Sequence, residues 1–168
     1  MAVSLTAFES IYREHVQTVF GLCRRLTRDP AAAEDATQET FLRAWRAWAQ
    51  FESRSAVATW LHRIAVNVVM ETRRRKSVQF LTFVSEPLPE CEGDWVLDTP
   101  VEVAELEAAV LALPEGARDV LVLSGIYDYS HQETAAMLGI AVGTCKAQLH
   151  RARRLIANKL SPGVDACA

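Results

Sequence analysis

The fold of this chain is decided by residues 130–154, which read SHQETAAMLGIAVGTCKAQLHRARR. The spacing predicts a short helix with one apolar face over His131–Leu138, after which Gly139 supplies a turn into a second, strongly basic helix. Ser130 and Glu133 stand at capping-box spacing, which gives the first helix a defined start. A short helix, a glycine turn and a basic helix together are typical of a helix-turn-helix that reads DNA.

The second helix of this pair separates its apolar and polar side chains by face. Its apolar positions recur at helical spacing and predict a buried stripe of Cys145, Leu149, Ala152 and Ile156. The opposite arc is predicted to face a duplex and holds Lys146, Ala147, His150, Arg151 and Arg154. The alternative is a solvated basic helix at the end of some bundle, and the glycine turn and capped partner helix would then need separate explanations.

Composition excludes several classes of protein. Half of the 168 residues are hydrophobic, which is enough for packed cores, so a chain that is disordered throughout is excluded. No window of 18 or more uncharged apolar residues suggests a membrane span, and the N-terminus lacks the pattern of a signal peptide.

The cysteines and histidines give no sign of a disulfide framework or a metal site. Cys23, Cys91, Cys145 and Cys167 are widely scattered, with no CxxC pair. We therefore expect reduced thiols and a cytoplasmic protein. The four cysteines and four histidines do not come together at zinc-ligand spacing, so we expect neither a metal nor a cofactor.

Charge is distributed unevenly along the chain. The net charge is −3, but residues 1–76 hold 12 basic and 8 acidic residues, residues 77–117 hold 9 acidic and no basic residues, and residues 118–168 hold 6 basic and 4 acidic residues. Two basic modules are thus joined by an acidic connector. The connector contains Pro87, Pro89, Gly93 and Pro100 and shows no sustained helical or strand period, which indicates a flexible linker.

These patterns predict an all-α protein made of two small helical bundles. We expect the first domain to cover residues 1–78, the acidic linker residues 79–99, and the helix-turn-helix domain residues 100–168. The motif Thr99-Pro100-Val101-Glu102 predicts the start of a helix with a buried stripe of Val103, Leu106, Val110 and Leu113, and Pro114 opens a further helix toward Ile126.

Three helices are predicted in the first domain, at about 4–26, 31–48 and 55–76. The core face of the first is expected to carry Phe8, Ile11, Tyr12, Phe20 and Leu26. The second helix, capped by Asp29 and Pro30, has an aromatic stripe that fits a core, formed by Phe41, Ala44, Trp45 and Trp48.

Another arc of the second helix carries Asp35, Gln38, Glu39 and Leu42 at i, i+3, i+4 and i+7. A leucine among acids and an amide favours a docking surface for a basic partner, and ordinary surface charge is the alternative.

The third helix is predicted to bury one face, with Val57, Trp60, Leu61, Ile64 and Val68 inside. Its other arc carries His62, Arg63, Asn67, Arg73 and Arg74, and four consecutive basic residues at 73–76 favour phosphate contact. Trp60 and Phe51 add aromatic groups on which unstacked bases can lie. For Trp60, the period of the helix favours the alternative of a core anchor.

Both ends of the chain resemble bacterial sigma factors of the extracytoplasmic-function group, the smallest members of the sigma-70 family. The resemblance is carried by AEDATQETF at residues 33–41, TWLHRIAVN at 59–67, LPE at 113–115 and VGTCKAQLHRAR at 142–153. It implies that Asp35, Gln38, Glu39 and Leu42 bind core RNA polymerase. It also implies that the third helix and the loop from Phe51 to Ala58 melt and read the −10 element.

The resemblance further implies that the C-terminal helix-turn-helix reads the −35 element. Lys146 and His150 would contact bases, and Arg151 and Arg154 would contact phosphates. Thr144 and Ala147 lie in the same helix and would also belong to the −35 binding surface. Another implied partner is an anti-sigma factor, which in this family is often a membrane protein with a zinc-bearing cytoplasmic domain. The expected function is promoter-specific initiation of transcription, in which the chain does no covalent chemistry.

Two other classes of function are open to this sequence. A stand-alone helix-turn-helix regulator explains the C-terminal half but leaves the Asp35-to-Leu42 arc without a role. A metal-dependent nuclease could use Glu34, Asp35 and Glu39, but no further carboxylate or histidine cluster completes the coordination, so we expect no enzyme.

Overall fold

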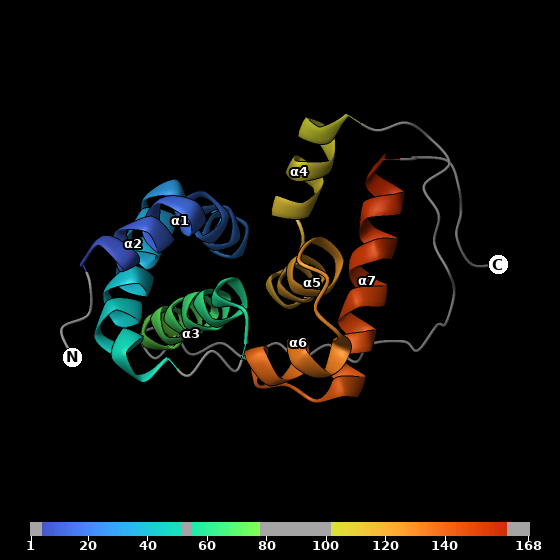
Figure 1. The fold of residues 1–168 in the computed structure, drawn as a ribbon. Helices are drawn as coiled ribbons and strands as arrows, with labels where there is room; N and C mark the ends of the chain where they lie inside the picture. Colours follow the sequence, from blue (N-terminus) through green and yellow to red (C-terminus); the bar gives the residue numbers. More distant parts are fainter. Residues whose placement is uncertain (1–4, 52–54, 78–101, 161–168) are drawn as a thin grey trace. The chain divides into compact units, whose positions relative to one another are not determined.

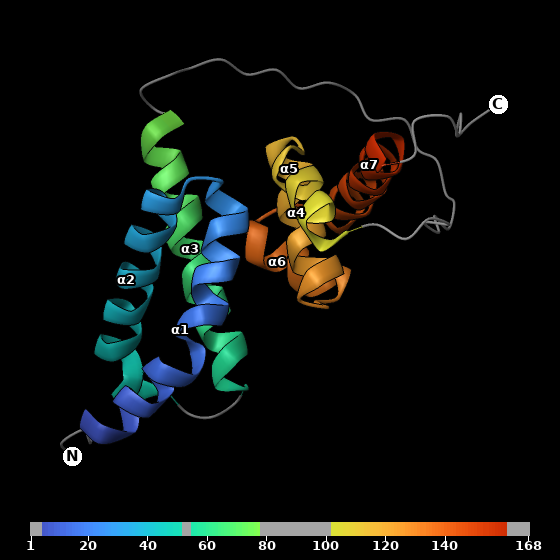
Figure 2. The ribbon, with the colours of Figure 1, turned by 90° about the horizontal axis from the view of Figure 1, so that it is seen from above.

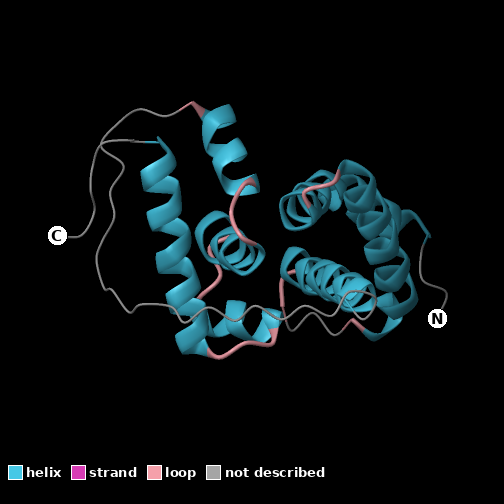
Figure 3. Cartoon of the chain, turned by 180° about the vertical axis from the view of Figure 1, so that it is seen from behind, coloured by secondary structure: helices cyan, strands magenta, loops and turns pink. Residues whose placement is uncertain are grey.

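The computed structural model describes residues 5–51, 55–77 and 102–160, and every regular element in these ranges is a helix (Figures 1 and 3). The chain divides into two compact units, residues 1–82 and 83–168. The predicted all-α fold with two helical bundles is therefore confirmed. The linker predicted at residues 79–99 lies outside the described residues, and so does the helix start predicted at Thr99.

Three helices pack on one another in the N-terminal unit: α1 (Leu5–Thr27), α2 (Pro30–Ala47) and α3 (Val57–Ser77), with the 3₁₀ turn η1 (Trp48–Gln50) after α2 (Figure 2). The predicted cap of α2 is present, because the Asp29 carboxylate accepts a hydrogen bond from the N–H of Ala31 at 3.1 Å and Pro30 opens the helix. The core consists mainly of aliphatic side chains from all three helices, among them Val19, Leu22, Leu26, Leu61 and Val66.

The predicted core face of α1 is only partly right. Phe8 and Leu26 are buried, whereas Tyr12 is 45% exposed. Among the aromatic side chains, Phe8 meets Phe41 and Trp45 edge-on, with ring centroids 6.5 and 5.1 Å apart. Phe8 and Phe41 are buried, whereas Trp45 stays 37% exposed.

The C-terminal unit contains α4 (Val103–Leu111), α5 (Glu115–Leu121), the π-helical segment η2 (Val122–Ile126), α6 (His131–Leu138) and α7 (Val142–Leu160). The residues Val120, Ala135, Cys145 and Leu149 form one buried cluster, and Leu121, Leu138 and Ile140 pack against it. Burial of the Cys145 thiol raises its pKa, which fits a small core residue. In the N-terminal unit burial raises the pKa of Cys23 to about 11.

The stripe predicted for α4 is wrong at its first two positions. Val103 is 83% exposed and Leu106 is 38% exposed, whereas Val110 and Leu113 are buried. The helix starts at Val103, with Glu102 as an N-cap that makes no side-chain capping bond, and its buried residues, Ala109 and Val110, lie toward its C-terminal end.

Candidate polymerase-docking and nucleic-acid surfaces

The helix α2 presents the predicted docking arc to solvent. Asp35, Gln38 and Leu42 are exposed, and Leu42 keeps half of its surface accessible at 50%. The opposite side of the same helix is buried through Ala33, Ala36, Thr37, Thr40 and Ala44. An exposed leucine beside an acid and an amide makes this arc suited to a partner that has both basic and apolar groups.

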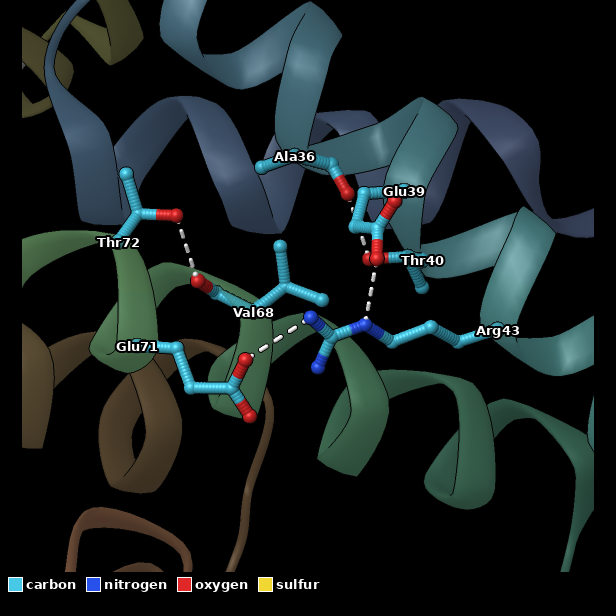
Figure 4. Close-up of polar contacts among 7 residues, drawn as sticks. All are labelled: Ala36, Glu39, Thr40, Arg43, Val68, Glu71 and Thr72. Carbon is cyan, nitrogen blue, oxygen red and sulfur yellow. Dashed lines mark hydrogen bonds and ion pairs between the residues drawn. The ribbon is translucent and has the colours of Figure 1, made fainter. Parts of the chain in front are cut away.

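Glu39, the remaining residue of this arc, forms an ion pair with Arg43, which was not singled out from the sequence. The Nε of Arg43 donates to Oε1 of Glu39 at 2.7 Å, and its Nη2 donates to Oε2 of Glu71 on α3 at 2.8 Å (Figure 4). The pKa of Glu71 is lowered, first by the hydrogen bond from Arg43 and then by the charges of Arg43, Arg75 and Arg74. One guanidinium thus connects the docking arc of α2 to α3.

An Arg43→Gln variant is expected to lose little stability. The side chains of Arg43, Glu39 and Glu71 are 33%, 40% and 35% exposed, so solvent screens their attraction. We expect the free energy of unfolding to fall by less than about 1 kcal/mol, which urea unfolding monitored by circular dichroism would measure. A loss well above this value would show that the bridge holds α2 and α3 together.

Aromatic rings gather where η1 leads toward α3. Trp48 and Phe51 are stacked with centroids 5.3 Å apart, and Phe51 lies 4.8 Å from Trp60. Phe51 and Trp60 are each partly buried and partly accessible. Trp60 is therefore an anchor within an aromatic cluster whose residues are only partly buried. Of the predicted base-capturing loop, residues 52–54 lie outside the described residues.

The predicted nucleic-acid arc of α3 needs one correction. Arg63, Asn67 and Arg74 are exposed, but His62 is buried, with only 5% of its surface accessible. Because α3 packs against both α1 and α2, its buried arc is wider than that of a helix with one neighbour. Burial and the nearby charge of His15 lower the pKa of His62 to about 4, so the ring is neutral at pH 7.

Arg73 is partly committed to the fold. Its guanidinium donates a hydrogen bond to the backbone carbonyl of Leu26, in the last turn of α1. Carbonyls at the end of a helix lack partners within the helix, and this bond satisfies one of them.

The helix-turn-helix is formed by α6 and α7 as predicted. The N–H of Glu133 donates to Oγ of Ser130 at 3.2 Å, and the N–H of Ser130 donates to Oε2 of Glu133 at 2.9 Å, which completes the capping box. Gly139 ends α6 with a left-handed φ of 67°. A residue with a Cβ would be strained there, so the turn favours glycine.

The two faces of α7 also follow the prediction. Cys145, Leu149, Ala152 and Ile156 are buried. Thr144 and Lys146 are exposed, and the other residues proposed to face DNA are partly accessible: Ala147, His150, Arg151 and Arg154. The outer face of α7 therefore combines basic groups with small or polar side chains, which suits a DNA groove.

A groove in the C-terminal unit was not foreseen from the sequence. It has a volume of about 310 Å³ and is lined by residues of α4, η2 and α7, among them Leu106, Val110, Ile126 and Ile156. Its exposed members at the start of α4 were assigned to the core, because helical periodicity marks an apolar face without showing whether another element covers it.

The structure offers no alternative site for metal chemistry within the part of the chain that it describes. No group of three His, Cys, Asp or Glu residues is placed there to hold a metal ion. Among the same residues, no helix combines the length and hydropathy needed to span a membrane.

Comparison with known proteins agrees with the two units. Residues 11–78 match the family model for sigma-70 region 2, and residues 104–156 match that for sigma-70 region 4. The chain is 32% identical to the extracytoplasmic-function RNA polymerase sigma factor SigM of Mycobacterium tuberculosis over 154 residues, which cover 92% of this chain and 77% of SigM. It is 30% identical to SigW of Bacillus subtilis, covering 92% of this chain and 89% of SigW.

Solved structures show the same fold. The sigma factor RpoE in its complex with the anti-sigma factor NepR from Bartonella quintana superposes with a TM-score of 0.69 at 24% identity, covering 96% of this chain and all of that one. CnrH, in complex with the cytosolic domain of CnrY, superposes with a TM-score of 0.61 at 24% identity, covering 95% of this chain and 90% of that one. With two matched domain models and relatives covered over most of their length, this chain belongs to the extracytoplasmic-function sigma factors of the sigma-70 family.

Proposed function

We propose that this protein binds core RNA polymerase and directs it to specific promoters. Its region 2 unit would dock on the polymerase through the α2 arc of Asp35, Gln38, Glu39 and Leu42. The observation that carries the proposal is the combination, in one chain, of this exposed arc with a complete helix-turn-helix in the region 4 unit.

DNA would be recognised in two forms. The outer face of α7 would enter the major groove of the −35 duplex, where Lys146 and His150 reach base edges and Arg151 and Arg154 reach phosphates. The exposed residues of α3 and the partly accessible Phe51 and Trp60 would hold a strand of the melted −10 element. Unstacking costs a few kcal/mol, which stacking and phosphate contacts must offset.

Regulation by an anti-sigma factor fits the same surfaces. The solved relatives RpoE and CnrH carry the anti-sigma factor NepR and the cytosolic domain of CnrY respectively. We propose a partner of this kind for the present chain, which would cover the docking arc or the DNA-binding faces until it is released.

Transcription from fragmented genomic DNA tests the function directly. Core polymerase is incubated with and without the protein, and the RNA 5′ ends are sequenced. The expected result is a set of new starts preceded by two short motifs about one and a half helical turns apart. A chain that binds a palindromic duplex by itself, gives no new starts and does not retain core polymerase in a pull-down would instead be a stand-alone regulator.

Lys146→Ala tests base reading by α7. If Lys146 contacts a base, the variant should lose roughly 1–3 kcal/mol of specific promoter binding and become less selective at one position of the −35 motif. Binding to promoter variants altered at each −35 position would measure this. An equal loss on all sequences would assign the side chain to a phosphate.

A further inference from the structure

Arg28, which lies between α1 and the capping residue of α2, has an unusual backbone conformation. Its φ is 67°, in the left-handed region. Any residue with a Cβ is strained there, and glycine is the residue that adopts this conformation freely at the end of a helix. An arginine at a position that favours glycine points to a use for its side chain.

The fold itself makes no visible use of that side chain. Arg28 is exposed, and its guanidinium forms no hydrogen bond or ion pair with the described residues. Its backbone does the structural work: its N–H donates to the carbonyl of Arg24 at 3.0 Å, and its own carbonyl accepts a hydrogen bond from the Arg24 guanidinium. A glycine at position 28 would keep both backbone contacts.

The surroundings of Arg28 are strongly basic. The bond from Arg73 to the carbonyl of Leu26 brings the basic end of α3 to the end of α1, only two residues before Arg28 (Figure 2). We call the cations at these two helix ends the basic patch: Arg24, Arg25, Arg28, Arg73, Arg74, Arg75 and Lys76.

The acids next to the basic patch are already engaged. The Asp29 carboxylate accepts the capping bond from Ala31, and the Glu71 carboxylate is paired with Arg43. The positive charge of the patch is therefore only partly offset from within the N-terminal unit. The exposed guanidinium of Arg28 suits a phosphate of nucleic acid, because a guanidinium donates two parallel hydrogen bonds to phosphate oxygens.

We propose that Arg28 contacts a backbone phosphate of the promoter and so extends the DNA-binding surface from α3 to the turn that follows α1. The inference rests on the function proposed above, since it requires the N-terminal unit to bind promoter DNA. Helix α1 was given no role in DNA binding by the sequence patterns.

The test compares Arg28→Gly with Arg28→Lys in holoenzyme assembled from full-length protein and core polymerase. The probe is a fluorescently labelled promoter fragment, taken from the strongest start in the transcription experiment and opened by mismatches at the −10 element. For Arg28→Gly we expect weaker binding and a slope of log K against log salt that is shallower by roughly 0.7–0.9, because one phosphate contact is lost. Arg28→Lys should keep the wild-type slope.

A measurement of stability distinguishes a phosphate contact by Arg28 from a structural role of its side chain. Because glycine relieves the strained backbone, the urea midpoint of Arg28→Gly should equal or exceed that of the wild type. Arg13→Ala is the matched control: it removes one exposed charge from the other half of α1 and should leave the salt slope unchanged.

Several outcomes would overturn the proposal. A wild-type salt slope for Arg28→Gly would show that no phosphate contact exists, and an equal change in Arg13→Ala would reduce the effect to overall charge. Weaker retention of core polymerase by Arg28→Gly would assign the residue to the protein interface. If the wild-type holoenzyme itself forms no specific promoter complex, the proposed function fails, and that result is visible without any variant.

Discussion

A double variant, Asp35→Arg with Gln38→Arg, is expected to abolish binding to core RNA polymerase. The two substitutions replace one negative charge with two positive ones on the exposed arc of α2, next to the accessible Leu42. A basic partner surface would then meet like charge, which costs several kcal/mol at a close interface. We expect at least a hundredfold loss of affinity, equivalent to about 2.7 kcal/mol, measured by titrating labelled protein with core polymerase.

The control for this variant is Glu14→Arg with Gln17→Arg on α1. It introduces the same charge change at the same i, i+3 spacing, and both positions are exposed. Arginine is a good helix former, so both double variants should keep the circular dichroism spectrum of the wild type. If the α2 variant still binds core polymerase, the docking arc is wrong; if both variants lose binding, the effect is general electrostatics.

The helix-turn-helix could be predicted in detail because its signals are local. Ser130 and Glu133 cap α6 across one turn, and Gly139 provides the left-handed residue that ends it. Helix α7 buries a single stripe of residues, so the helical spacing of its apolar positions was enough to identify Cys145 and Leu149 as buried.

The errors arise where tertiary packing decides. His62 follows Leu61 directly and was placed on the polar arc, but α3 is packed by both α1 and α2 and therefore buries it. Val103 continues an apolar stripe and is nevertheless 83% exposed, because nothing described covers the first turn of α4. The π-helical segment Val122–Ile126 was predicted as ordinary helix, since the extra residue in its turn has no simple sequence signal.

The candidate surfaces show the same limit. Asp35 and Gln38 could be found from helical spacing, because they need only share an exposed arc. The pairing of Arg43 with Glu71 joins residues 28 positions apart, and the link from Arg73 to Leu26 joins residues 47 positions apart. Such contacts depend on how the helices pack, which one sequence does not specify.

The buried His62 predicts a second large effect, a loss of stability in acid. Its pKa is lowered to about 4 in the folded protein, against an ordinary value of 6.5, first by burial and then by the charge of His15. Between these two values the unfolded chain binds a proton that the folded chain does not. Stability is therefore fully present above pH 6.5 and falls as the pH drops toward 4.

The size of the effect follows from linkage. A difference of about 2.5 pKa units between the folded and unfolded states corresponds to about 3 kcal/mol when complete, and to roughly 2–3 kcal/mol at pH 4.5. Urea unfolding of the full chain at pH 7 and pH 4.5 measures the loss. His62→Gln removes the titrating ring while keeping a polar side chain, so its stability should fall less over the same range.

The carboxylates titrate in both the wild type and His62→Gln. The difference between their losses of stability therefore reports the contribution of His62 alone. Equal losses of stability in the wild type and in His62→Gln would show that His62 accepts its proton without penalty and is therefore accessible to water in the folded state. A smaller loss in the variant would establish that α3, the helix proposed to hold melted DNA, is anchored by a histidine that must stay neutral. The exposed residues Arg63 and Asn67, next to the anchor and one turn further on, would then be held in place for DNA by the packing beneath them.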